Sequence, residues 1–333
     1  MTRRINLALQ GGGAHGAFTW GVLDRLLEED DIEIAGISGT SAGALNGAAL
    51  KAGLLQGGPA AARENLDWLW ARMGATSAPG LPAWMGVAGL SSALETSWTY
   101  ALAESWERFF SPYATGPFYE NPLRSVVEQF RFDRVCAGSG PALFIGATNV
   151  RTGKIKLFEG DAITPDAILA SACLPMLFRA VEIDGEAYWD GGYTGNPALF
   201  PLFDPALPSD IVIVNINPLE RPGIPRSPQD IRNRIDEISF NSSLLRELRA
   251  IAFVQRLLDR GAVAEGAMKR VHIHMIADDP LMNELSVATK MIPLPQVMRT
   301  LKEAGRAAAT RFLEEEAHHV GQRSSADLAG LYG

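Results

Sequence analysis

"ISGTSAG", residues 37–43, ends the apolar run "IEIAGISG" and begins the small-residue segment "SAGALNGAALKAG". The apolar run predicts a buried strand, and the segment after it predicts a helix. "GTSAG" within this stretch matches G-x-S-x-G, in which the residues flanking the serine lack side chains because strand and helix crowd together. Ser41 is therefore a candidate nucleophile between Gly39 and Gly43, at a helix N-terminus that favours negative charge. The competing interpretation is an ordinary Gly/Ser turn.

A second glycine-rich turn lies one helix and one strand earlier. Residues 5–9 predict a buried strand that runs into "GGGAHG", residues 11–16, ahead of an expected helix over residues 17–29. This alternation of strand and helix favours a parallel sheet with right-handed crossovers. Both glycine turns then lie at the carboxyl ends of parallel strands, which are about 5 Å apart if the strands are neighbours.

"GGGAHG" fits two kinds of chemistry. It matches the G-x-G-x-x-G pattern for dinucleotides, but that pattern requires an acidic residue at the end of the second strand. Glu33 lies at the start of that strand instead. The alternative is an oxyanion hole, in which exposed backbone N–H groups stabilise the oxygen of a tetrahedral intermediate. We favour the oxyanion hole because it explains why the loop lies beside Ser41.

A nucleophilic serine also needs a general base. His272 and His274 alternate along one expected strand, which is typical of structural positions, although a histidine-dependent mechanism through either of them remains an alternative. Asp190, in "YWDGGYTGNP", follows a short expected strand, and Gly191 and Gly192 let the chain turn so that the carboxylate faces a partner. We therefore prefer Asp190 as the base over the reading of an ordinary Asp-Gly turn.

"GGGAHG", "GTSAG" and "DGG", in this order, resemble the patatin-like phospholipase family, including its bacterial members. The resemblance covers about residues 5–217. It implies a three-layer αβα fold with a mostly parallel central sheet, and a serine–aspartate dyad without histidine. It also implies no cofactor and no metal. The roles it assigns are the nucleophile to Ser41, the base to Asp190, and the oxyanion hole to the N–H groups of Gly11, Gly12 and Gly13.

Further glycines support the three motifs, and one residue departs from the family pattern. Many relatives carry Arg or Lys where this chain has His15, for which we expect a role in stabilising the loop or at its rim. The supporting glycines are Gly16, Gly39, Gly43, Gly191 and Gly192.

The expected organisation is a single domain over residues 1–333 with two additions. A cap or lid is predicted over residues 60–135, and a helical C-terminal extension over residues 220–333. The predicted cap holds five of the seven tryptophans and is rich in Pro and Gly breaks. Its tryptophans suit either an acyl-chain tunnel or bilayer contact, or a cap packed on the core of the domain itself.

Charge and composition limit the partners. The net charge of −8 argues against nucleic acid as a partner. Two cysteines, Cys136 and Cys173, are too few for a disulfide framework and indicate buried thiols in a reducing compartment. The N-terminal apolar run is too short for a signal peptide, so we expect a cytoplasmic location, with peripheral contact at the inner membrane surface. An arginine stripe near residues 249–260 suits either anionic lipid or a solvated helix face.

These features predict a serine esterase that serves lipid degradation. Its expected substrate is a lipid carboxylic ester, either phospholipid or lysophospholipid. The alternatives are a histidine-dependent serine esterase or acyltransferase and a catalytically silent lipid-binding protein.

Overall fold

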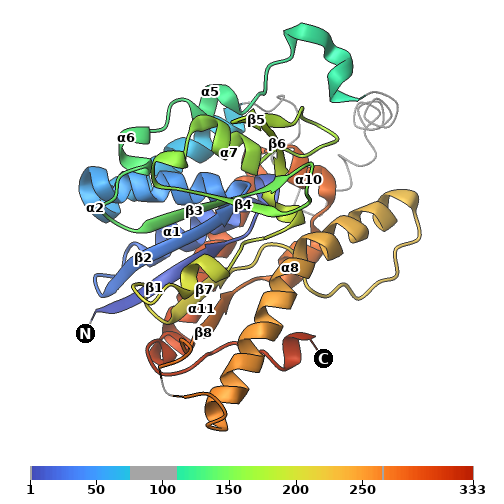
Figure 1. Ribbon diagram of the computed structural model, residues 1–333. Coiled ribbons are helices and arrows are strands. Elements are labelled where there is room, and N and C mark those ends of the chain that lie inside the picture. The colour runs from blue at the N-terminus through green and yellow to red at the C-terminus, as the bar shows by residue number, and fades with distance from the viewer. Residues whose placement is uncertain (1, 76–110, 265, 333) are drawn as a thin grey trace.

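The central sheet of this computed structural model has eight strands within the described residues, which are 2–75, 111–264 and 266–332 (Figure 1). The strand order is β5-β6-β3-β2-β1-β7-β8, and β4 pairs with β3. The parallel strands are β1 (Arg3–Leu9), β2 (Ile32–Thr40), β3 (Ala142–Asn149), β7 (Asp210–Val214) and β8 (His272–Ile276). The antiparallel strands are β4 (Ile155–Glu159), β5 (Val181–Ile183) and β6 (Glu186–Asp190).

Side chains of the central strands alternate between two apolar cores. Leu7 and Leu9 of β1 lie in the larger core, whereas Ala8 between them lies in the smaller one, as the period of a strand requires. The smaller core is closed by α8 (Pro228–Asp259). The larger core is closed by α1 (Gly16–Leu26), α2 (Ala42–Ala75), α7 (Pro165–Ser171) and α11 (Pro295–Glu315). Helices therefore cover both faces, and the expected αβα fold with a mostly parallel sheet is confirmed.

Short helices complete the description. The short α-helices are α5 (Arg124–Val127), α6 (Phe132–Val135), α9 (Asp279–Glu284) and α10 (Val287–Met291). The 3-10 helices are η1 (Gly13–His15), η2 (Pro112–Phe118), η3 (Gly160–Ala162), η4 (Gly191–Tyr193), η5 (Phe200–Phe203), η6 (Ala317–His319) and η7 (Gly330–Tyr332).

Capping residues determine where helices begin. Thr164 Oγ1 accepts a hydrogen bond of 3.2 Å from Ala167 N at the start of α7, as its sequence predicts. The same signal marks α8, because Ser227 Oγ accepts one of 3.0 Å from Asp230 N. Helix α8 therefore begins at Pro228, whereas the amphipathic pattern of the sequence predicts a long helix only over about residues 244–260. The additional turns bring this helix to the candidate site.

Residues 60–75 continue α2 instead of beginning the expected cap. Leu66 and Trp70 are buried in the larger core, and the Trp70 indole donates a hydrogen bond of 2.9 Å to Asn46 Oδ1. Gly57 and Gly58 form a kink within α2, and the helix continues beyond it through residues 60–75. Three tryptophans assigned to the cap lie outside the described residues: Trp84, Trp98 and Trp106.

Residues 220–333, predicted as a helical extension, form part of the central sheet and of the larger core. Strand β8 pairs in parallel with β7 and completes the sheet, and α11 contributes Leu301 and Phe312 to the larger core. Within the described residues, no helix has the length and apolar character needed to cross a membrane.

Replacing Trp70 with alanine tests whether residues 60–75 belong to the larger core or to a separate cap. We expect the free energy of unfolding to fall by about 3–5 kcal/mol, because a core aromatic side chain is lost and Asn46 loses its donor. Urea denaturation would measure this change. Glu64→Ala, at an exposed position of the same helix, serves as the control and should change the free energy by about 0.5 kcal/mol or less. An unchanged value for Trp70→Ala would indicate a segment that folds separately from the core.

Candidate active site

Ser41 occupies a strained corner between β2 and α2. Its backbone angle φ is +54°, in the left-handed region that residues other than glycine rarely adopt. A Cβ atom on Gly39 would lie 2.6 Å from Gly43 O, so the flanking position requires glycine. The Ser41 N–H donates a hydrogen bond of 2.9 Å to Ser171 Oγ, which anchors the corner to α7. The predicted strand-to-helix elbow is therefore the observed geometry.

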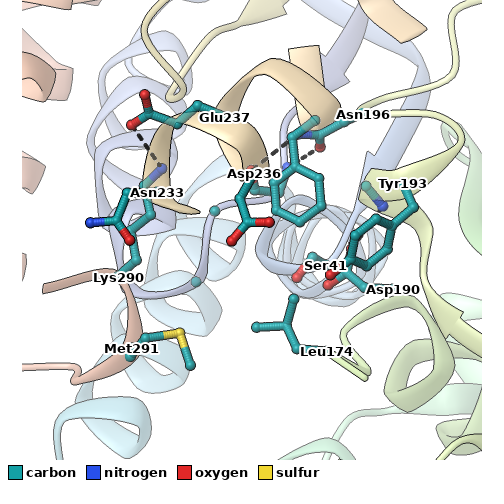
Figure 2. A pocket seen from close by; sticks show the side chains of 15 residues that line it. Ser41, Leu174, Asp190, Tyr193, Asn196, Asn233, Asp236, Glu237, Lys290 and Met291 are labelled. Atoms are coloured by element: carbon teal, nitrogen blue, oxygen red, sulfur yellow. Dashed lines mark hydrogen bonds and ion pairs between the residues drawn. The ribbon is translucent and has the colours of Figure 1, made fainter. Parts of the chain in front are cut away.

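Asp190 ends β6 and faces Ser41 from the neighbouring part of the sheet (Figure 2). The carboxylate is buried, accepts a hydrogen bond of 2.7 Å from Gly192 N, and faces the Ser41 side chain. Burial raises the pKa of Asp190 to about 7, against the lowering effects of the Gly192 N–H and the Ser41 hydroxyl. A carboxylate with this pKa is suited to accept a proton at neutral pH.

The glycine loop after β1 lies next to Ser41, because β1 and β2 are paired neighbours with Leu9 opposite Gly39. The Gly11 N–H donates a hydrogen bond of 2.7 Å to Asn196 Oδ1 and is therefore already engaged. The N–H groups of Gly12 and Gly13 have no acceptor among the described residues. The predicted set of oxyanion donors is thus reduced from Gly11, Gly12 and Gly13 to the last two.

Two asparagines that sequence reasoning left unassigned hold this loop. The Gly11 carbonyl accepts hydrogen bonds from Asn217 Nδ2 at 2.8 Å and from Asn196 Nδ2 at 3.3 Å. Asn217 Oδ1 in turn accepts one of 3.1 Å from Lys290 Nζ. The only sequence signal is position, since both asparagines follow expected strands, in "DGGYTGNP" and "IVIVNINP".

His15 is buried beneath the loop, so the expectation of a rim position is wrong. Its Nε2 lies 2.8 Å from Thr289 Oγ1 of α10, which connects that helix to the glycine loop. Burial lowers the pKa of His15, and the nearby charge of Lys290 lowers it further. The imidazole is therefore neutral at pH 7 and supplies no fixed positive charge, and its contacts agree with a loop-stabilising role.

His272 and His274 lie away from Ser41. Both contact Asp210 Oδ1, at 3.3 and 3.0 Å, and Asp210 is the first residue of β7. Because β7 runs parallel to β1 and β2, its start lies at the opposite edge of the sheet from Ser41, which follows the end of β2. Burial raises the pKa of Asp210, but the hydrogen bonds with the two histidines outweigh it and hold that pKa low. The structure does not bring these histidines to the nucleophile.

A cavity of about 90 Å³ opens in front of Ser41 and Asp190. Leu174 and Tyr193 form one side, and the first turns of α8 form the other (Figure 2). The Tyr193 ring packs edge-on against Phe240 of α8 at 5.1 Å between ring centres. The cavity suits an ester group with apolar neighbours. The α8 residues that line it are Asn233, Asp236, Glu237 and Phe240.

Buried charge forms part of the wall of this cavity. Glu237 is paired with Arg221 at 2.6 Å and lies 3.8 Å from Lys290 Nζ. Burial raises the pKa of Glu237, but these cations outweigh it and keep the carboxylate ionised. Across residues 2–75, 111–264 and 266–332, no group of three or more His, Cys, Asp or Glu side chains is placed to hold a metal ion.

Comparisons with known proteins agree with the motifs. A model of the patatin-like phospholipase family matches residues 7–203, whereas no curated protein matches the chain. VipD from Legionella pneumophila is 14% identical, with 94% of this chain and 67% of VipD covered and a TM-score of 0.43. ExoU, solved in complex with SpcU from the type III secretion system of Pseudomonas aeruginosa, is 15% identical, with 94% of this chain and 52% of ExoU covered and a TM-score of 0.36. This chain thus spans about half the length of ExoU. Because the family model covers more than half of the sequence, the chain belongs to the patatin-like phospholipase family of lipid acyl hydrolases.

Proposed function

We propose that this chain hydrolyses the carboxylic esters of phospholipids or lysophospholipids through a dyad of Ser41 and Asp190. One observation carries the proposal: a buried carboxylate with a pKa raised to about 7 faces the hydroxyl of a strained elbow serine. A serine hydroxyl needs such a base to become nucleophilic. Membership in a phospholipase family supports a lipid ester as the substrate.

In the proposed reaction, Ser41 Oγ attacks the ester carbonyl while Asp190 accepts the hydroxyl proton. The N–H groups of Gly12 and Gly13 donate to the oxyanion of the tetrahedral intermediate. Asp190 then passes the proton to the leaving alcohol, which departs and leaves an acyl-serine. Water, deprotonated by Asp190, then attacks this acyl group. The bond from the acyl carbon to Ser41 Oγ breaks, Asp190 returns the proton to Ser41 Oγ, and the fatty acid is released.

Asn196 and Asn217 are positioning residues in this proposal. The Gly11 carbonyl and the Gly12 N–H belong to one peptide unit, so hydrogen bonds to the carbonyl orient and polarise the N–H. The asparagines therefore act through the loop; Asn217 does not line the cavity, whereas Asn196 also forms part of its wall.

Replacing Asn217 with alanine is expected to lower kcat by about tenfold to hundredfold with little change in KM, since an oxyanion donor acts mainly in the transition state. Steady-state turnover of a short-chain p-nitrophenyl ester measures both constants. Asn65→Ala is the matched control, because its amide donates to the Ala49 carbonyl within α2 and not to the glycine loop. A raised KM with an unchanged kcat would instead assign Asn217 to substrate binding.

The substrate class is tested with the wild-type chain. We expect turnover of the short-chain ester and release of fatty acid from phospholipid vesicles, detected by mass spectrometry of the products. Lysophospholipid supplied alone distinguishes the two proposed lipid classes. Turnover of none of these esters by folded protein would favour the alternative of a silent lipid-binding protein.

A further inference from the structure

One face of α8 is exposed and combines apolar with cationic side chains. Residues three or four positions apart share a helix face, and this spacing runs from residue 231 to residue 256. We name this surface the α8 outer face; it has an isoleucine end (Ile231, Ile235 and Ile238) and an arginine end (Arg246, Arg249 and Arg256). Ser242 lies between the two ends, and no acidic residue of α8 occupies a position on this face.

The isoleucine end is unusual for a surface in water. Ile231, Ile235 and Ile238 are 44%, 59% and 54% exposed, although the opposite side of α8 buries Leu244 and Leu248 in the smaller core. Three consecutive positions of one helix stripe form a contiguous apolar patch, which marks an interaction surface more often than isolated residues do. At the arginine end, Phe253 is 54% exposed and lies 5.9 Å from the Arg256 guanidinium.

We propose that the α8 outer face binds the surface of an anionic lipid bilayer, with the isoleucine end inserted among the headgroups. A helix with apolar and basic residues on one side binds in the membrane interface for two reasons. Its apolar side chains are buried among the lipids, and its basic side chains are attracted to anionic headgroups. The chain carries a net charge of −8, so most orientations are repelled by such a bilayer. The arginine end is a local exception and selects one orientation.

Charge also decides between a bilayer and a second copy of the chain. In a two-fold dimer the same surface meets itself, so two arginine ends would face each other or lie over the apolar patch of the partner. An anionic bilayer instead complements the arginines and accepts the isoleucines. We therefore infer that an anionic lipid surface, and not a second copy of the chain, covers the α8 outer face. Self-association is one of the outcomes that the experiment below detects.

The α8 outer face also lies close to the cavity of the candidate active site. This step of the inference rests on the proposed function. Asp236, labelled in Figure 2, and Phe240 line the cavity, and helical spacing places them away from the isoleucine end, on another side of the same turns. The bilayer would then lie about one helix diameter, ~10 Å, from the cavity wall. A lipid in that leaflet is long enough to reach Ser41 while its remaining chain stays in the membrane.

Vesicle co-sedimentation tests the docking separately from the chemistry. The protein carries Ser41→Ala throughout, and the vesicles are phosphatidylcholine with or without phosphatidylglycerol, at low and high salt. We expect binding only with phosphatidylglycerol, weakened by salt. Arg246→Glu/Arg249→Glu should lower the partition coefficient roughly 30-fold or more, because each basic residue contributes about fivefold at an anionic surface. Ile235→Glu/Ile238→Glu should also reduce binding strongly.

Two variants outside the α8 outer face serve as matched controls. Met268→Glu changes an apolar side chain that is 46% exposed, and Arg299→Glu changes an exposed arginine of α11, on the other side of the sheet. Both should bind vesicles like the parent protein. Equal binding by all variants, or binding to neither vesicle, would overturn the proposal. Loss of a dimer on Ile235→Glu/Ile238→Glu in sedimentation velocity, without vesicles, would assign the face to a second copy.

Activity measurements separate this inference from the proposed function. With Ser41 intact, the α8 variants should keep wild-type turnover of the soluble short-chain ester and lose turnover of anionic vesicles in parallel with binding. Absence of turnover with every ester contradicts the proposed function, whatever the vesicle binding. Full vesicle turnover by variants that bind no vesicles contradicts the docking alone.

Discussion

Replacing Ser41 with alanine is expected to lower kcat/KM for ester hydrolysis by about 10⁴-fold or more, the effect of losing a nucleophile that acts as a unit with its base. Alanine removes the only atom that forms the acyl intermediate in the proposed reaction. The N–H groups of Gly12 and Gly13 remain, so residual turnover above the uncatalysed rate is compatible with this loss. Turnover of the p-nitrophenyl ester under saturating and subsaturating conditions measures it.

Two serine controls separate chemistry from structure. Ser125→Ala, at an exposed position, should leave kcat/KM unchanged. Ser171→Ala removes the acceptor of the Ser41 N–H and a donor to the Gly146 carbonyl, so it should cause a smaller loss, about tenfold, through the position of the elbow. Circular dichroism confirms that each variant is folded. Substantial activity in folded Ser41→Ala protein would remove Ser41 from the mechanism.

The elbow and the glycine loop could be predicted from sequence because their geometry is local. Gly39 and Gly43 are required by contacts within a few residues of Ser41, and the short link from β1 through α1 to β2 makes the two strands neighbours. The turn after Asp190 could be predicted for the same reason, since Gly191 and Gly192 follow it directly, whereas its place opposite Ser41 depends on the pairing of β6 with β3.

The remaining parts of the site depend on contacts between distant segments. Asn217 and Lys290 reach the loop from about 200 residues or more away in sequence, and an asparagine or lysine carries no periodic pattern that would reveal this. The early turns of α8 were missed because Ile231, Ile235 and Ile238 are exposed, so their spacing marks no core face. The predicted cap wrongly includes residues 60–75, because Trp68 and Trp70 share its tryptophan-rich composition although Trp70 lies in the larger core and Trp68 packs against that core.

Replacing Asp190 with asparagine is the second large effect that we expect, a loss of about 10⁴-fold in kcat/KM at neutral pH. Asparagine keeps the size of the side chain and its hydrogen bond with Gly192 N, but it cannot accept the Ser41 proton. Turnover of the p-nitrophenyl ester measures this loss.

The pH dependence of kcat/KM in the wild-type protein is set by the same carboxyl group of Asp190. Because Asp190 must be ionised to act as the base, kcat/KM should rise about tenfold per pH unit below its pKa and level off above it. The inflection is expected near the raised pKa of Asp190, about 7.

The rival mechanism predicts a different pattern for the same measurements. A histidine base would also produce an inflection near neutral pH, since the ordinary pKa of histidine is about 6.5. Replacing His272 and His274 one at a time with alanine separates the two, because both contact Asp210 at the other edge of the sheet. Folded variants should keep wild-type kcat/KM and the same inflection. If either variant lost activity and inflection while Asp190→Asn kept both, the base would be the histidine. Because burial is what raises the pKa of Asp190, the packing around the end of β6 gives a carboxylate the proton affinity that other serine hydrolases obtain from imidazole.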